Sequence, residues 1–216
     1  FSYLEVDSQQ MIISSLSERE AGSVIDNLMA DDAVDLLEEM PANVVDRLLA
    51  NANPDTRKAI NQLLRYPEDS AGSIMTVEYV ALKENFTVAQ AIERIRAVGL
   101  TSETIDICYV LDASRRLVGT VALRYLLLGQ GDDLVRDIMH ENVISINTLM
   151  DQEQAAAQFK KYDFTAMPVV DNEDRMVGII TVDDIVDILE EETTEDMEKM
   201  AAIVPSDKPY MRSTVG

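Results

Sequence analysis

The sequence predicts an α+β protein in which an all-helical first third is followed by two copies of a β-α-β-β-α unit and an acidic C-terminal helix. Three observations support this fold class. Residues 1–66 show only helical periodicity, one order of strands and helices occurs twice after Pro67, and acidic residues crowd the end of the second copy. The 216 residues are enough for two or three small domains, each with its own core.

The first third is expected to form short helices packed as hairpins. In residues 31–40 apolar side chains recur every three or four positions, which is the period of an amphipathic helix. Pro41 and the Asn53-Pro54 pair then open two further helices. Because no period-two alternation interrupts this pattern, residues 1–66 are predicted to form an all-α unit, called the helical domain below.

The rest of the chain is predicted to repeat one fold. Ile-Met pairs at 74–75 and 138–139 are 64 residues apart, and Val-Gly pairs at 118–119 and 177–178 are 59 apart. Landmarks that recur together with element order indicate a tandem repeat. The predicted elements are strand 79–82, helix 87–95, strands 107–111 and 117–121 and helix 123–128, then strand 143–146, helix 151–160, strands 167–170 and 176–181 and helix 182–189. We place the first unit at 67–136, the second at 137–190 and a connecting helix at 191–216.

Composition excludes several classes of function. Lys and Arg number 18 against 40 Asp and Glu, a formal net charge of −22, so nucleic acid and anionic lipid would be repelled. Cys108 and His140 are the only residues of their types, which excludes a disulfide framework and a zinc site of the usual kind. No nucleophile motif accompanies either residue, so an enzyme is not expected.

The acidic residues after the second unit suggest a cation ligand. Residues 183–198 hold nine acidic and no basic residues. On a helix Asp184, Asp187 and Glu191 lie three or four positions apart and form one stripe, where like charges destabilise each other. Oxygen-only clusters suit Mg²⁺ or Ca²⁺, and without a calcium-loop pattern a loose, water-rich Mg²⁺ site is favoured. The alternative is a solvated acidic face, which the sequence leaves open.

Two segments of the second unit resemble a known domain. Residues 164–171, FTAMPVVD, and 177–184, VGIITVDD, look like a cystathionine-beta-synthase-type (CBS) domain, which usually packs in pairs. With the helical domain, the junction YPEDSAGSIMT at 66–76 and the acidic helix after the pair, the whole chain resembles the cytoplasmic part of the MgtE family of magnesium transporters and channels. The resemblance implies a Mg²⁺-sensing regulatory region on the cytoplasmic side of the membrane, a homodimer through the CBS domains, and a transmembrane domain after the last helix.

The resemblance also implies which residues hold Mg²⁺. Asp31 in the helical domain would face Asp184, Asp187 would share an ion with Asp163, and Glu153 would lie close to Asp163. Three further residues, Glu192, Glu195 and Asp196, would begin the helix that leads to the pore. Bound ions would draw the acidic surfaces together and close the pore, because facing carboxylates about 4 Å apart repel by roughly 4 kcal/mol at an effective dielectric constant near 20.

A second ligand is implied by the CBS resemblance. Such modules often bind an adenine nucleotide such as ATP through Gly-x-x-Thr-x-x-Asp, which the second unit keeps at Gly178, Thr181 and Asp184. The first unit has Tyr125 where Asp is expected. The nucleotide-binding set is therefore predicted as Arg124, Phe164, Thr181 and Asp184. The alternative functions are a nucleotide-sensing CBS module that regulates another protein and an acidic adaptor without a small ligand.

Overall fold

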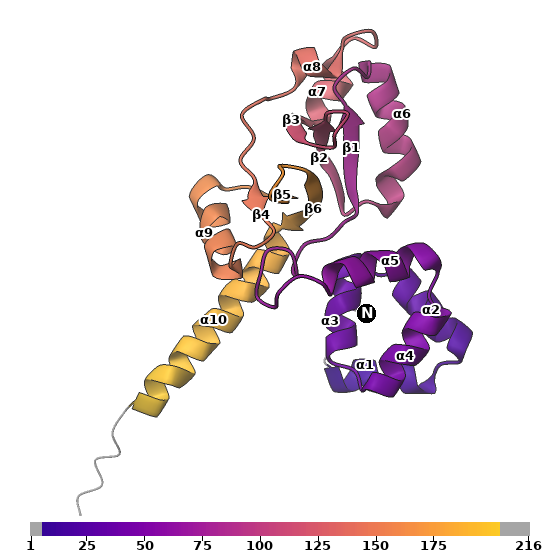
Figure 1. Cartoon of the computed structure of the whole chain (residues 1–216), viewed down its shortest axis with the longest axis vertical. Coiled ribbons are helices and arrows are strands. Elements are labelled where there is room, and N and C mark those ends of the chain that lie inside the picture. Colours follow the sequence, from indigo (N-terminus) through magenta and orange to yellow (C-terminus); the bar gives the residue numbers. More distant parts are fainter. Residues whose placement is uncertain (1–5, 204–216) are drawn as a thin grey trace, which may run out of the picture.

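The structure, a computed structural model, describes residues 6–203. Figure 1 shows the helical domain beside a pair of small α/β units, from which the last helix projects. The predicted α+β class is confirmed, since a helical region precedes two small three-stranded sheets.

The helical domain consists of short helices whose apolar faces meet. Their bounds are α1 Val6–Ser15, α2 Glu18–Asp26, α3 Ala30–Glu38, α4 Ala42–Asn51 and α5 Pro54–Leu63. Ser17 begins α2 with a capping box, and Asn53 caps α5 ahead of Pro54. Helix α2 packs on α4 and α3 on α5, which buries Leu48 and Ile60 completely.

The two units share one topology, as predicted. Each sheet pairs its first strand parallel and its third strand antiparallel to the middle one. The first unit contains β1 Tyr79–Lys83, α6 Val88–Val98, the 3-10 helix Gly99–Thr101, β2 Thr104–Leu111, β3 Leu117–Ala122, α7 Leu123–Leu128 and α8 Val135–Ile138. The second contains β4 Ile146–Asn147, α9 Gln152–Tyr162, β5 Ala166–Val170, β6 Met176–Thr181 and α10 Val182–Ile203.

Two expectations differ from the structure in detail. The strand predicted at 143–146 is reduced to β4, because residues 143–145 run along the gap between the units and line two hollows there instead of pairing with β5. Helix α10 continues without a break past residue 190, so the boundary placed there falls inside one helix. Residues 204–216 of the predicted connecting helix lie outside the described residues.

The units are interlocked by the segments that precede them. Thr76, ahead of β1, exchanges two backbone hydrogen bonds of 2.8 and 2.9 Å with Ile179 of β6 in the other unit. His140, ahead of β4, does the same with Thr120 of β3 at 2.8 and 3.0 Å. Each Ile-Met landmark therefore packs on the Val-Gly landmark of the other unit, which explains why both recur.

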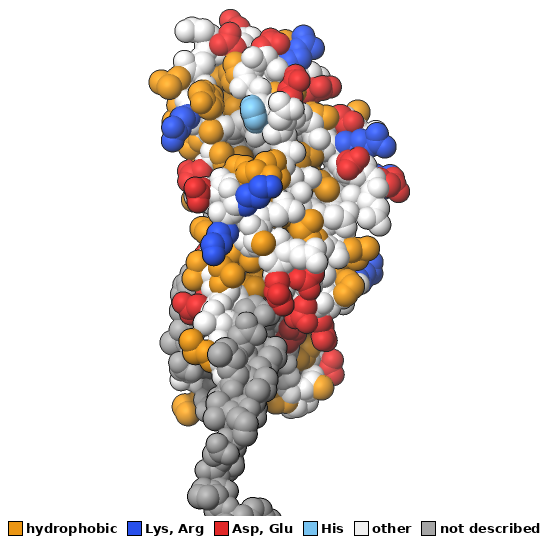
Figure 2. Space-filling view, turned by 90° about the vertical axis from the view of Figure 1, so that its left-hand side faces the viewer, with side chains coloured by type: hydrophobic (Ala, Val, Ile, Leu, Met, Phe, Trp, Pro, Cys, Tyr) orange, Lys and Arg blue, Asp and Glu red, His pale blue; other side chains and the backbone are white. Residues whose placement is uncertain are grey.

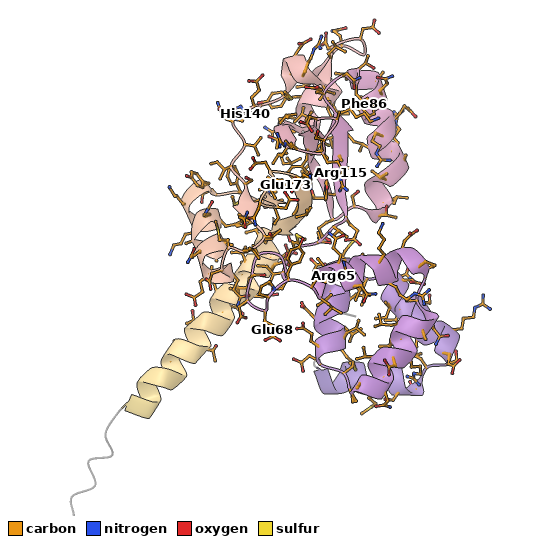
Figure 3. All side chains as sticks on the ribbon, in the orientation of Figure 1. Arg65, Glu68, Phe86, Arg115, His140 and Glu173 are labelled. Atoms are coloured by element: carbon orange, nitrogen blue, oxygen red, sulfur yellow. The ribbon has the colours of Figure 1, made fainter. Side chains whose placement is uncertain are left out.

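The turns of the two units meet at the centre of the pair. Met176 N donates to the carbonyl of Arg115 at 3.0 Å, and Leu117 N donates to that of Asp174 at 3.2 Å. Arg115 and Asp174 have positive φ angles of 65° and 61°, and the turn of each unit begins with an Asp whose carboxylate accepts backbone N–H groups. Figure 3 shows Arg115 and Glu173, which lie on these two turns, at the middle of the pair.

The helical domain shares its core with the second unit. One buried cluster runs from Leu37 and Ile60 through Met75 to Phe159 and Ile188, whereas the first unit has a separate core. A shared core fixes the helical domain against α10, and this packing positions the acidic site described below.

Gly178→Ala is expected to destabilise the chain. An added Cβ would lie 2.5 Å from the Thr76 carbonyl oxygen and 2.6 Å from Met75 Sδ, and the backbone oxygen is held by the bond from Ile179. Overpacking of this kind costs about 1–3 kcal/mol of unfolding free energy, measurable by urea denaturation. Gly131→Ala is the control, because its added Cβ meets only Ala89 Cβ at 3.8 Å. Equal urea midpoints of unfolding for the two variants would contradict the role of Gly178 in joining the two units.

Candidate metal-binding site

An acidic cleft of about 420 Å³ lies where the helical domain meets the second unit. Its walls are α3, the segment after α5 and the first turns of α10. Among the described residues that line it there is no Lys or Arg. Figure 2 shows acidic side chains gathered on the lower half of one face of the molecule, and Figure 3 places Glu68 at the junction of the two domains. The acidic residues of the cleft are Asp31, Asp35, Glu38, Glu39, Glu68, Asp69, Asp184 and Asp187.

Asp31 and Asp184 meet in this cleft, as the sequence analysis expected. Asp31 stands in the first turn of α3 and is 9% exposed, with one carboxylate oxygen accepting a 2.9 Å hydrogen bond from Asp32 N. Burial, and then the charge of Asp184, raise the pKa of Asp31 to about 8. Burial first, and the neighbouring carboxylate second, thus disfavour the ionised form of Asp31.

Asp184 is held by the end of β6. Its carboxylate accepts hydrogen bonds from Thr181 Oγ1 at 2.9 Å and from Thr181 N at 3.2 Å. Burial nevertheless raises the pKa of Asp184 to about 6, and the charges of Asp183 and Asp32 add to the effect. Two carboxylates on different domains therefore face each other, each with hydrogen bonds but without a cationic partner among the residues lining the cleft.

A second group of acids adjoins Asp184 on the side of the first unit. Burial raises the pKa of Glu103, and the charges of Asp183 and Asp184 raise it further, with smaller contributions from Asp32 and Glu78. Sequence reasoning missed Glu78 and Glu103, because neither belongs to an acidic run and only the tertiary fold brings Glu103 to the start of α10 and Glu78 to the start of α3. It also missed Asp35, Glu38, Glu39, Glu68 and Asp69, although the acidic content of 31–39 was a visible signal.

The remaining predicted metal residues are dispersed. Asp187 is exposed and lines the cleft. Glu153 lies in the first turn of α9 and Asp163 is its left-handed C-cap, so a helical rise over ten residue steps separates the two by about 15 Å along the helix. The expectation that they lie close together is wrong, because α9 is one unbroken helix, and neither lines the cleft. The side chains of Glu192, Glu195 and Asp196, on α10, lie outside the described ones.

The donor set fits a hard, hydrated cation. The cleft offers carboxylate oxygens, and the described residues that line it include no histidine, cysteine or methionine. No three acidic, histidine or cysteine side chains among the described residues are close enough to enclose a metal. An ion here would therefore have one or two carboxylates and keep several waters, which is the usual coordination of Mg²⁺.

The predicted nucleotide-binding residues do not share one pocket. A mainly apolar hollow of about 210 Å³ lies between the units, lined by Phe164 together with Ile107, Tyr109, Thr120, His140, Asn142, Val143, Ile144, Ala166 and Pro168. Thr181 is bonded to Asp184 at the acidic cleft, and Arg124 is exposed on α7.

Strand register explains the separation. Ile107 pairs with Ala122 in the first unit as Ala166 pairs with Thr181 in the second, so Tyr125 is the counterpart of Asp184. The two related sides of the pair therefore carry different groups: Phe164 belongs to the side with the hollow, whereas Asp184 faces the helical domain.

Two interlocked β-α-β-β-α units that meet a helical domain across an acidic cleft define a CBS-pair regulatory region. Comparison with known proteins agrees: the MgtE intracellular N domain matches residues 1–69 and the CBS domain matches residues 135–191. A solved cytosolic domain of the Mg²⁺ channel MgtE in complex with ATP is 38% identical, with a TM-score of 0.81 over 87% of this chain and 77% of that one. The soluble part of a magnesium transporter is 34% identical, with a TM-score of 0.84 over 88% and 75%. The chain belongs to the MgtE family.

Full-length relatives are longer than this chain. Magnesium transporter MgtE of Bacillus subtilis is 38% identical over 92% of this chain and 44% of its own length. That of Thermus thermophilus is 42% identical over 83% and 41%. This chain thus spans less than half of the relatives it matches. Within residues 6–203 no helix has both the length and the apolarity that a membrane span requires.

Proposed function

We propose that this chain is the Mg²⁺-sensing regulatory region of a magnesium transporter or channel, with no enzymatic activity of its own. The observation that carries the proposal is the acidic cleft in which Asp31 of the helical domain faces Asp184 of the second CBS unit. The region would lie on the cytoplasmic side of the membrane, with α10 leading to the transmembrane domain of the same protein. The similarity to magnesium transporters MgtE and to the cytosolic domain of an Mg²⁺ channel supports this assignment.

Cation binding would act as an electrostatic switch. Ionised carboxylates about 4 Å apart would repel by roughly 4 kcal/mol at an effective dielectric constant near 20. Without an ion, docking must therefore either keep this repulsion or protonate Asp31, whose pKa is raised to about 8, and either course opposes docking of the helical domain. A divalent ion between Asp31 and Asp184 replaces that repulsion with attraction. Because a ligand shifts an equilibrium only through differential affinity, Mg²⁺ must bind the docked state more tightly than the undocked one. Docking at high Mg²⁺ would close the pore and limit uptake.

Mg²⁺ is expected to compact the chain, and Asp184→Asn is expected to remove that response. Small-angle scattering across a millimolar Mg²⁺ titration should show the radius of gyration of the unmodified chain falling. The variant should already be compact in chelator, since its neutral amide no longer repels Asp31. Asp46→Asn is the matched control, because Asp46 is an exposed acid on α4 away from the cleft. An identical response to Na⁺ at equal ionic strength, or none, would reject the proposal.

Adenine-nucleotide sensing is a second candidate function. The hollow between the units is mainly apolar, and Phe164, 37% exposed, offers an aromatic face on which a base can stack. A related cytosolic domain was crystallised with ATP. This function would coexist with cation sensing, because the hollow and the acidic cleft have no lining residue in common.

Phe164→Ala is expected to weaken ATP binding by about 5- to 160-fold in isothermal titration calorimetry, since base stacking on an aromatic ring contributes roughly 1–3 kcal/mol. Tyr162→Ala is the matched control. Its ring centroid is 5.7 Å from that of Phe164, but Tyr162 does not line the hollow. Equal losses in both variants, or no binding to the unmodified chain, would remove this function from consideration.

We further propose that the CBS pair forms a homodimer through α7 and α10. Leu127 is 65% exposed and Val186, its counterpart in the second unit, is 47% exposed. Leu128, Val182 and Leu189 are also exposed on these helices. An exposed apolar pair at equivalent positions of both units, with further exposed apolar side chains on the same helices, suits packing against a second copy, because clustered exposed apolar surface marks interaction sites.

Val186→Glu is expected to halve the mass measured by light scattering after size exclusion, since the dimer would have to bury an unpaired charge. Met11→Glu is the control, because Met11 is 74% exposed on α1, outside the proposed interface. A monomeric unmodified chain, or a dimer that survives the Val186 change, would contradict this arrangement.

A further inference from the structure

Helix α3, which carries Asp31, begins without a cap of its own. Its N-cap residue, Met29, makes no side-chain hydrogen bond to the first turn. The first N–H groups of a helix have no partner within the helix, and that end carries partial positive charge. Here Ala30 N donates instead to Glu78 Oε2 at 3.4 Å, across the boundary between the helical domain and the CBS pair.

Glu78 is rigidly mounted on the CBS pair. The same Oε2 atom accepts hydrogen bonds from Thr76 Oγ1 at 2.5 Å and from Val77 N at 3.1 Å. The Glu78 carbonyl accepts from Glu103 N at 2.8 Å. Thr76 is fully buried and its backbone is hydrogen-bonded to β6 of the other unit. The Glu78 carboxylate is therefore held in place by contacts that involve both CBS units.

Opposite forces therefore act on one helix end. The N-terminus of α3 attracts the Glu78 carboxylate, whereas Asp31, one residue into the helix, is repelled by Asp184. The attractive contact needs no metal. It holds α3 at the place where its first-turn carboxylate reaches the cleft.

We infer that Glu78 is a positioning residue that docks the helical domain on the CBS pair by capping α3 from outside. The inference deepens the proposed Mg²⁺ sensing, since the docked register that Glu78 sets is the one in which Asp31 and Asp184 can share an ion. A helix-cap contribution of ordinary size corresponds to about a 2- to 30-fold change in the ratio of docked to undocked chain.

The competing explanation is that Glu78 is one more acid in a repelling cluster. The two explanations predict opposite signs. If Glu78 is a cap, Glu78→Ala lowers the docked fraction without metal and raises the Mg²⁺ concentration at which half of the chains are docked. If Glu78 only adds negative charge, the same change raises the docked fraction and lowers that Mg²⁺ concentration.

The test measures distances between spin labels on Asn43 of the helical domain and Arg94 of the first unit, in chelator and then in Mg²⁺. Both positions are exposed, while the single native thiol, Cys108, is buried. Glu78→Ala should lower the docked-to-undocked ratio about 2- to 30-fold in chelator. Glu84→Ala, which removes an exposed acid after β1, should leave it unchanged. An unchanged or higher ratio in Glu78→Ala would overturn the inference.

Two controls keep the outcome decisive. A label pair within the CBS units, Arg94 with Lys160, must keep its distance. If it does not, Glu78→Asp replaces the alanine variant, because the shorter side chain keeps the negative charge but withdraws the carboxylate from Ala30 N; a lower docked-to-undocked ratio again supports the cap, and an unchanged ratio overturns it. If the unmodified chain is fully docked, hydrogen exchange of the α3 amides reports rare openings in the same proteins, with the same expected fold-change and the same overturning result. An unmodified chain that ignores Mg²⁺ would reject the sensing function alone, because the comparison in chelator still decides the role of Glu78.

Discussion

Burial of like charges at the boundary between the helical domain and the second CBS unit is the constraint on which the site depends. The shared core brings α3 against α10, and that packing takes Asp31 and Asp184 out of bulk water on facing surfaces. Burial is the first cause of the raised pKa of each residue, and the neighbouring carboxylates add to it. The hydrophobic contacts that hold the domains together thus oppose the electrostatics of the polar groups they enclose, and this opposition is the basis of the proposed response to a cation.

The CBS pair supplies a rigid frame for this balance. Each unit contributes its leading segment to the other sheet, and the central turns are joined by backbone hydrogen bonds. Interfaces built from such reciprocal backbone pairing have few alternative arrangements of similar energy. The helical domain, by contrast, meets the frame through side chains, a shared apolar cluster and the contact at the start of α3. In the proposed switch the helical domain is therefore the part that moves, and α10 belongs to the frame.

The two copies of the internal repeat carry different side chains at equivalent positions. Tyr125 and Asp184 are counterparts by strand register, and they mark the divergence. On the side of Asp184, the acids and the helical domain form a polar cleft; on the other, Phe164 and Tyr109 help to line a mainly apolar hollow. One duplicated fold thus carries a polar cleft on one side and a mainly apolar hollow on the other, and the two proposed functions are assigned to them.

The sequence by itself determined the fold class, the order of the elements and the acidity of the region around Asp184, because periodicity, caps and charge runs are local properties of the chain. The meeting of Asp31 with Asp184 was also anticipated, through the family resemblance. Only the tertiary structure decided that Glu78 and Glu103 join this cluster, that Glu153 and Asp163 stay apart on α9, and that Phe164 and Asp184 belong to different sites. These outcomes depend on which units interlock and which faces of the helices pack together. Such contacts join residues distant in sequence, and no local pattern encodes them.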